Sequence, residues 1–285
     1  MDPPSATPVR ATGTVLVPPE SAGFGVVSDL DDTVIETNVQ SLLRMARTVF
    51  LGNARTRVPF PGVSSFYRAL QSDGAGGRFN PIFYVSSSPW NLYDMLVEFL
   101  SLSEVPVGPM VLRDWGLSPA GIAPGRNRDH KLAALRDIFE TYPGLPFLLI
   151  GDSSEQDPEI YAEVVGLYPG RVKAIYIRNL SRDLARPEAI GALAERVAAA
   201  GSSLVLANDT VGAARHAIEQ GYVAAASLPG IDVVRRAEEP DPAPPAPVVA
   251  VTAPPETASA AVEQALQTPA ADATAAPTVV LDGRG

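Results

Sequence analysis

The chain has 285 residues, of which 46% are hydrophobic and none is cysteine, so disulfides, thiolate catalysis and zinc–thiolate sites are excluded. Its formal net charge is -10, and seven of the acids and one arginine lie after residue 236. Residues 1–236 are therefore only mildly acidic and lack the basic surface that is typical of a nucleic-acid-binding protein. No apolar stretch approaches the ~20 residues of a membrane span and no secretion signal is visible, so we expect a cytoplasmic protein, at most peripheral at membranes.

Strands and helices are predicted to alternate along most of the chain. Residues 14–17 are compatible with an edge strand, and residues 24–28 are typical of a buried parallel strand because they are apolar on both faces. The further strands are predicted over residues 81–85, 109–114, 146–150, 172–177 and 204–207, and the helices over residues 39–51, 63–70, 89–100, 131–141, 159–167, 189–200 and 210–219. This alternation indicates an α/β fold, a doubly wound parallel sheet covered on both faces.

Composition divides the chain into three parts. Residues 1–23 form an N-terminal segment, residues 24–236 carry the alternating pattern, and residues 237–285 are dominated by Pro, Ala, Val and Thr without periodicity. Such a composition predicts a disordered, acidic tail. If the protein has a protein partner, we expect this tail to contact it.

The first buried strand ends in carboxylates. Asp29 and Asp31 are two positions apart in extended backbone, so their side chains share one side, where repulsion is costly unless a cation lies between them. In an open parallel sheet, ligands bind beyond the carboxyl ends of the strands. Oxygen ligands at such a position predict a Mg²⁺ ion next to a phosphate.

Three serines follow the strand at residues 81–85. The sequence predicts that Ser88 caps a helix whose first residue is Pro89. A helix that begins there would direct free backbone N–H groups at the end of the sheet, where they favour an anion.

Each polar feature has an ordinary structural interpretation when it is taken alone. A single Asp-x-Asp is common in capped turns, Lys131 could be a solvated helix residue, and Gly151-Asp152 could be a simple junction between a strand and a turn. Together and in this order, however, the acids at Asp29 and Asp31, then Ser86, Lys131 and Asp152 with Asp157 resemble the four motifs of the haloacid dehalogenase (HAD) superfamily of phosphohydrolases. Longer strings, over about residues 24–180, resemble the catalytic domain of the actin-patch-type phosphatidate phosphatases: residues 28–33, 59–62, 80–93, 112–116 and 151–161.

The resemblance implies a role for each motif residue. Asp29 would attack phosphorus and form an aspartyl-phosphate, while Asp31 would act as general acid and then as general base. Ser86, Ser87 and Lys131 would bind the phosphate oxygens. Mg²⁺ would be held by four residues, Asp29, the backbone carbonyl of Asp31, Asp152 and Asp157.

The spacing of the motifs leaves no room for a sizeable cap domain, because 57 positions separate Asp29 from Ser86 and 45 separate Ser86 from Lys131. A capless HAD-like site is open and suits a large substrate. The resemblance implies phosphatidate, cleaved at a membrane surface to diacylglycerol and phosphate. Two alternatives remain: a phosphatase for a soluble or protein-borne phosphate, and a non-catalytic phosphate-binding or scaffold protein, against which the intact acids argue.

A few other residues receive structural interpretations. Asp32 is interpreted as a structural acid, either in the turn or behind the site acids. Trp90 and Trp115 are interpreted as packing residues in preference to membrane anchors, and His216 has no visible partner. Ser154-Glu155 departs from the Gly-Gln pair that is more usual in the family, which would alter the loop without changing its acids.

Overall fold

The computed structural model describes residues 15–31, 33–34, 60–72, 79–114, 126–181, 183–238, 249–251 and 280–281. They form a sheet with the strand order β3-β2-β1-β4-β5-β6-β7-β8. The strands are β1 (Gly25–Asp29), β2 (Ile82–Pro89), β3 (Met110–Arg113), β4 (Phe147–Asp152), β5 (Val172–Arg178), β6 (Ser203–Ala207), β7 (Val249–Val251) and β8 (Val280–Leu281). Strands β1 to β6 pair in parallel, which confirms the predicted doubly wound sheet.

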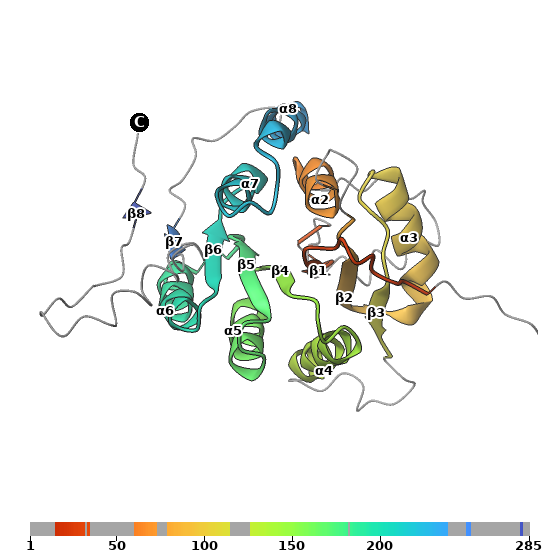
Figure 1. Cartoon of the computed structure of the whole chain (residues 1–285), viewed down its shortest axis with the longest axis horizontal. Coiled ribbons are helices and arrows are strands. Elements are labelled where there is room, and N and C mark those ends of the chain that lie inside the picture. Colours follow the sequence, from red (N-terminus) through yellow and green to blue (C-terminus); the bar gives the residue numbers. More distant parts are fainter. Residues whose placement is uncertain are drawn as a thin grey trace, which may run out of the picture.

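Helices cover both faces of this sheet (Figure 1). One face carries α2 (Val63–Gln71), α3 (Tyr93–Leu102), α7 (Thr210–Glu219) and α8 (Leu228–Glu238), and the other carries α4 (Arg126–Thr141), α5 (Asp157–Leu167) and α6 (Arg186–Ala199). Two short 3-10 helices, η2 (Trp90–Leu92) and η4 (Ala225–Ser227), precede α3 and α8.

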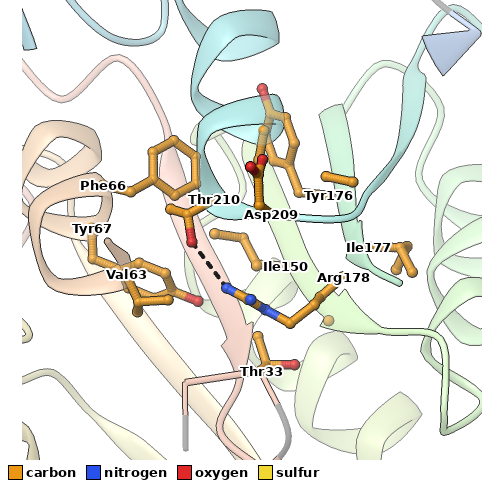
Figure 2. Close-up of a pocket in the computed structure, with 13 residues that line it drawn as sticks. Thr33, Val63, Phe66, Tyr67, Ile150, Tyr176, Ile177, Arg178, Asp209 and Thr210 are labelled. Carbon is orange, nitrogen blue, oxygen red and sulfur yellow. Dashed lines mark hydrogen bonds between the residues drawn. The ribbon is translucent and has the colours of Figure 1, made fainter. Parts of the chain in front are cut away.

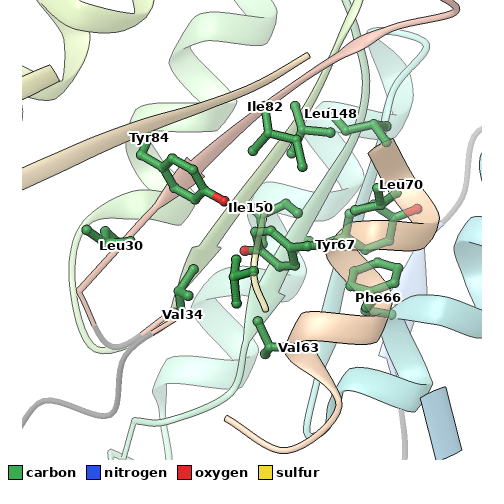
Figure 3. Close-up of a cluster of buried hydrophobic side chains, with 14 of the residues drawn as sticks. Leu30, Val34, Val63, Phe66, Tyr67, Leu70, Ile82, Tyr84, Leu148 and Ile150 are labelled. Atoms are coloured by element: carbon green, nitrogen blue, oxygen red, sulfur yellow. The ribbon is translucent and has the colours of Figure 1, made fainter. Parts of the chain in front are cut away.

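Alternate residues of each strand supply two hydrophobic clusters, one under each helical layer. Val26 of β1 packs in the cluster beneath α2 and α3, whereas its neighbour Val27 packs in the cluster above α4 and α5. Figure 3 shows the first cluster, where Phe66 and Tyr67 of α2 face the apolar side chains of the central strands. Because both faces are buried, the strands read as continuous apolar runs in the sequence.

The strand order reverses between β1 and β4. From β1 the chain proceeds outward through β2 and β3, and then returns to β4 on the other side of β1. Adjacent connections therefore leave in opposite directions, and a crevice forms at the carboxyl ends of these two strands. Asp29 ends β1 and Asp152 ends β4.

The structure differs from the predicted elements at both ends of the domain. Residues 15–17 form no strand, and the Tyr142 hydroxyl instead donates a hydrogen bond to the Leu16 carbonyl, at 3.1 Å. The sequence shows no sign of α8, because Pro229-Gly230 resembles a helix breaker; proline is tolerated there in the first helical turn.

Two short strands lie within the tail that begins at residue 237. β7 and β8 come from the tail, and β7 pairs antiparallel with β6, the edge of the parallel sheet. An exposed strand edge offers unpaired backbone groups to any β-prone segment. Several predictions fall outside the described residues. They concern the helix over residues 39–51, the roles of Asp32 and Trp115, and the absence of a cap domain. Within the described part of the chain, no helix has both the length and the apolar character needed to cross a membrane.

Candidate active site

The end of β1 presents two buried acids. Asp29 is only 1% exposed, and its carbonyl accepts a hydrogen bond of 2.6 Å from the Ser28 hydroxyl, which also contacts the hydroxyl of Tyr67 at 2.7 Å. Tyr67 comes from α2, so this helix helps to hold the turn in place. Asp31, two residues further, is buried as well.

The end of β4 adds a second pair of acids. The backbone N–H of Asp152 donates to Oδ2 of Asp157 at 3.2 Å, and Oδ1 of Asp152 accepts from the backbone N–H groups of Ser154 and Glu155, at 2.6 and 3.2 Å. A Cβ atom at Gly151 would lie 2.4 Å from Oδ2 of Asp157. Glycine is therefore required at position 151 for Asp157 to approach the strand.

Lys131 joins the two strand ends. It lies in the second turn of α4, is almost fully buried, and its Nζ lies 2.5 Å from Oδ1 of Asp157, 3.0 Å from Oε2 of Glu155 and 3.3 Å from Oδ1 of Asp29. Burial alone would lower the pKa of Lys131, but the charges of Asp29, Asp157 and Glu155 outweigh it and raise the pKa well above its usual value. The ammonium group is therefore permanently charged.

The acids outnumber this single cation. One carboxylate oxygen each from Asp29, Asp152 and Asp157 lie within 4.8 Å of one another. Burial raises the pKa of Asp29 well above its usual value and that of Asp157 to about 6, and it also raises the pKa of Asp152. Among the described residues, Oδ2 of Asp29 and Oδ2 of Asp152 accept no hydrogen bond, and the contact of Oδ1 of Asp29 is the ion pair with Lys131. A cluster of buried oxygen ligands with uncompensated charge fits a divalent cation.

The Asp31 carboxylate turns away from this cluster, toward β2. Oδ2 accepts a hydrogen bond of 2.6 Å from the Ser86 hydroxyl, and the Ser88 hydroxyl lies 3.2 Å from Oδ1. Burial raises the pKa of Asp31, although the bond from Ser86 opposes that shift. The backbone carbonyl of Ser86 also contacts Nε2 of His130, at 3.2 Å.

The predicted helix start after Ser86 is wrong. β2 continues to Pro89, η2 begins at Trp90, and α3 begins only at Tyr93. Ser88 therefore does not cap a helix. Because alternate residues of an extended strand share a face, Ser86 and Ser88 both reach Asp31. Ser87 lies between them and is also buried. Binding of phosphate by Ser87 stays a prediction.

All of the predicted site residues lie at the carboxyl edge of the sheet, but two contacts were missed. Ser88 was assigned to capping, although its spacing from Ser86 was a signal for a shared face. Glu155 was noted only as a departure from the family, whereas its carboxylate contacts Lys131. Its position three residues after Asp152, in the same turn, was the available signal.

A small cavity borders the cluster at Gly151, on the face covered by α2 and α7 (Figure 2). Apolar side chains from both helices and from β4 and β5 line most of it, and its volume is about 30 Å³. Figure 2 shows Arg178 among the lining residues, where its guanidinium donates a hydrogen bond of 3.0 Å to the Thr210 hydroxyl. The guanidinium also lies 4.1 Å from the centre of the Phe60 ring. The cavity has room for one or two water molecules.

Two residues outside the cluster differ from their predicted roles. Trp90 is not a core residue, because it is 49% exposed. His216 has a partner, since its Nδ1 lies 3.1 Å from the hydroxyl of Tyr176 in the core.

Comparisons with known proteins identify relatives of this chain. The family model for the catalytic domain of phosphatidate phosphatase APP1 matches residues 24–179. The phosphatidate phosphatase APP1 of Saccharomyces cerevisiae is 32% identical over 163 residues, which are 57% of this chain and 27% of the yeast protein. An uncharacterized protein of Schizosaccharomyces pombe is 32% identical over 166 residues, 56% of this chain and 26% of that protein. The chain thus spans about a quarter of the length of these relatives.

One solved structure was also compared. A crystal structure from Mesorhizobium loti that is described as a HAD-like phosphatase has 16% sequence identity and a TM-score of 0.40. The match covers 67% of this chain and 92% of the other. That likeness is too low to bear on function.

Proposed function

The chain belongs to the family of phosphatidate phosphatase APP1 catalytic domains, and from this membership we propose that it is a Mg²⁺-dependent phosphomonoester hydrolase that converts phosphatidate to diacylglycerol and phosphate. The observation that carries the proposal is the buried cluster of Asp29, Asp152 and Asp157 around the Lys131 ammonium. Phosphoryl transfer requires in-line placement and neutralised charge more than any other chemistry, and this cluster is suited to supply both.

Asp29, Asp152 and Asp157 would hold the metal ion, with the backbone carbonyl of Asp31 as the further ligand. The bound ion would neutralise charge on the transferring phosphoryl group, so that an anionic nucleophile can approach it. The fit rests on Oδ2 of Asp29 and Oδ2 of Asp152, which are buried and accept no hydrogen bond from any described residue, and on the raised pKa values that burial gives these acids.

Asp29 would be the nucleophile. One of its carboxylate oxygens would form a bond to phosphorus while the bond from phosphorus to the glycerol oxygen breaks, leaving an aspartyl-phosphate. Water would then attack this phosphorus, releasing phosphate and restoring the Asp29 carboxylate. Lys131, already 3.3 Å from Oδ1 of Asp29, is placed to offset the negative charge of the transferring oxygens.

Asp31 would transfer the protons. Its pKa is raised by burial, which favours the protonated acid that must donate to the departing glycerol oxygen. The resulting carboxylate would accept the proton of the attacking water in the second step. Hydrogen bonds from Ser86 and Ser88 hold this side chain and limit its rotation between the two steps.

The experiment that tests the proposal is phosphate release from phosphatidate in mixed micelles. We expect Mg²⁺-dependent release that is abolished by a chelator, is absent in Asp29→Asn, and exceeds the release from a panel of soluble phosphomonoesters. Activity confined to the soluble esters would retain the mechanism and reject the substrate. Absence of turnover on every ester would reject both and favour a phosphate-binding protein.

A further inference from the structure

An exposed aromatic pair lies beside the candidate active site. Trp90 follows β2 directly and is 49% exposed, and Tyr93 opens α3 and is 40% exposed. Their rings stack at a centroid distance of 6.0 Å with an interplanar angle of 29°. The pair is held close to the site, because Ser86 and Ser88 of the same strand are bonded to Asp31.

A second exposed apolar residue lies on the other side of the site. Leu184, in the connection between β5 and α6, is 96% exposed. This connection is tied to the loop after Asp152, since the backbone N–H groups of Leu180 and Ser181 donate to the Ser153 hydroxyl at 2.8 and 2.9 Å. Leu184 therefore extends from a segment anchored to the loop that carries the site acids.

The strand order places these residues on both flanks of the carboxylates. β2 pairs with β1 and β5 pairs with β4, so the exposed side chains follow the strands on either side of the two that end in Asp29 and Asp152. A partner with a flat apolar surface can contact the side chains on both flanks of the carboxylates at the same time. We propose that the carboxyl edge of the sheet docks on a lipid surface through Trp90, Tyr93 and Leu184, an inference that rests on the proposed function.

The residue types suit a lipid surface, and the phosphatidate substrate of the proposed function is what favours lipid over a folded partner. Tryptophan and tyrosine combine an apolar ring with a polar tip, and both are enriched where membranes meet water. The cavity beside the cluster, with a volume of about 30 Å³, is far too small for an acyl chain. This cavity therefore does not take up the chains of a phosphatidate molecule, which agrees with chains that remain in the bilayer while the phosphate enters the site.

The test is sedimentation of the full chain with vesicles of phosphatidylcholine in Mg²⁺ buffer. We expect the wild type to sediment with the vesicles. Trp90→Ser should weaken partitioning roughly tenfold, and Leu184→Ser should weaken it roughly threefold or more, because each removes apolar surface from the contact.

A matched control exists at the far end of α3. Leu102, the last residue of this helix, is 54% exposed, and a helix antiparallel to the strands ends at the opposite edge of the sheet. Leu102→Ser should therefore leave vesicle binding unchanged. Equal loss in Leu102→Ser and Trp90→Ser would overturn the proposal, as would a wild type that does not bind vesicles; a protein partner would then be the alternative for the exposed pair.

Tryptophan fluorescence gives a second measurement, which does not require the protein to fold after a large side chain has been replaced by serine. Trp90 and Trp115 are the two tryptophans of the chain, so the difference between the wild type and Trp90→Phe reports on Trp90. Brominated phosphatidylcholine should quench this difference signal, and a signal insensitive to brominated lipid would overturn the docking. These vesicles contain no phosphomonoester, so vesicle binding is measured independently of the proposed activity. Loss of docking with persistent phosphatidate turnover in micelles would reject the docking surface alone. Docking without turnover would reject the proposed function alone.

Discussion

The core around His216 and the carboxylate cluster both bury titratable groups, and they accommodate them differently. His216 of α7 contacts the Tyr176 hydroxyl, and burial lowers its pKa to about 4, so it stays neutral at physiological pH. The cluster instead gathers Asp29, Asp152 and Asp157 around a charged Lys131. A lone base can give up its proton. Several acids that share one ammonium can be compensated by protons, as the raised pKa values of Asp29 and Asp157 indicate, or by a further cation.

This difference separates a buried group in the core from the buried groups that we propose to be catalytic or metal-binding. Residues that are arranged for function are often costly for stability. The variants below test whether the cluster behaves as a site and His216 as part of the core, and they run from the largest expected effect to the smallest.

Asp29→Asn should have the largest effect, on activity. The amide keeps the shape of the side chain but is a poor nucleophile, so we expect turnover of phosphomonoesters to fall by at least ~10³-fold. In chelator, the midpoint of thermal unfolding should not fall, because the variant removes one buried negative charge from a crowded cluster. Asp137→Asn, at an exposed position on α4, is the control. A clear drop in the unfolding midpoint would mean that the Asp29 carboxylate stabilises the fold.

Gly151→Ala should disturb both stability and activity. The added Cβ would lie 2.4 Å from Oδ2 of Asp157, so we expect the free energy of unfolding to fall by about 1–3 kcal/mol and Mg²⁺-dependent turnover to be lost. Urea denaturation and phosphate release measure the two effects. Gly166→Ala is the matched control, since nothing lies within 4 Å of a Cβ there, and alanine in a helix should stabilise by about 0.5–1 kcal/mol. Equal behaviour of the two variants would contradict the close approach of Asp157.

Mg²⁺ should stabilise the folded chain measurably. A ligand present at 100 times its dissociation constant adds about 2.7 kcal/mol to the free energy of unfolding if it binds the folded state only. We expect this gain in urea titrations of the wild type with Mg²⁺ against chelator, and its loss in Asp152→Asn. Asp137→Asn, with the same change in net charge, should retain the full response. A response that survives in Asp152→Asn would place the ion elsewhere.

His216→Leu should change the pH dependence of stability and leave activity intact. The unfolded chain protonates His216 near pH 6.5, while the folded chain does so only near pH 4, so the unfolded state binds more protons between these values and stability falls as the pH falls. At pH 5 the wild type should have lost about 1–2 kcal/mol from this group. Urea titrations from pH 7.5 to 5 should show a shallower fall for His216→Leu. Identical slopes for the two proteins would mean that His216 can be protonated in the core.

Most of the parallel sheet was predictable because its strands are short, apolar on both faces and end abruptly in polar residues. The helix α4 was predicted to begin at Lys131 but begins at Arg126, since charged residues in its first turn hide the helical period. α8 was missed because Pro229-Gly230 is read as a breaker by local pattern alone. The local sequence pattern shows the periodicity of apolar residues and the face that they occupy. This signal is absent where the end of a helix is polar.

The positions of the site acids at strand ends, their order and the resemblance to a phosphatase family came from the sequence by itself. The tertiary structure decided which of them meet: Lys131 with Asp157 and Glu155, and Asp31 with Ser86 and Ser88. It also decided that Trp90 is exposed. The physical reason is that the side-chain pattern of a strand depends only on residues close together in the sequence. Contact between strand ends depends instead on the order β2-β1-β4-β5 in the sheet, which long-range packing determines.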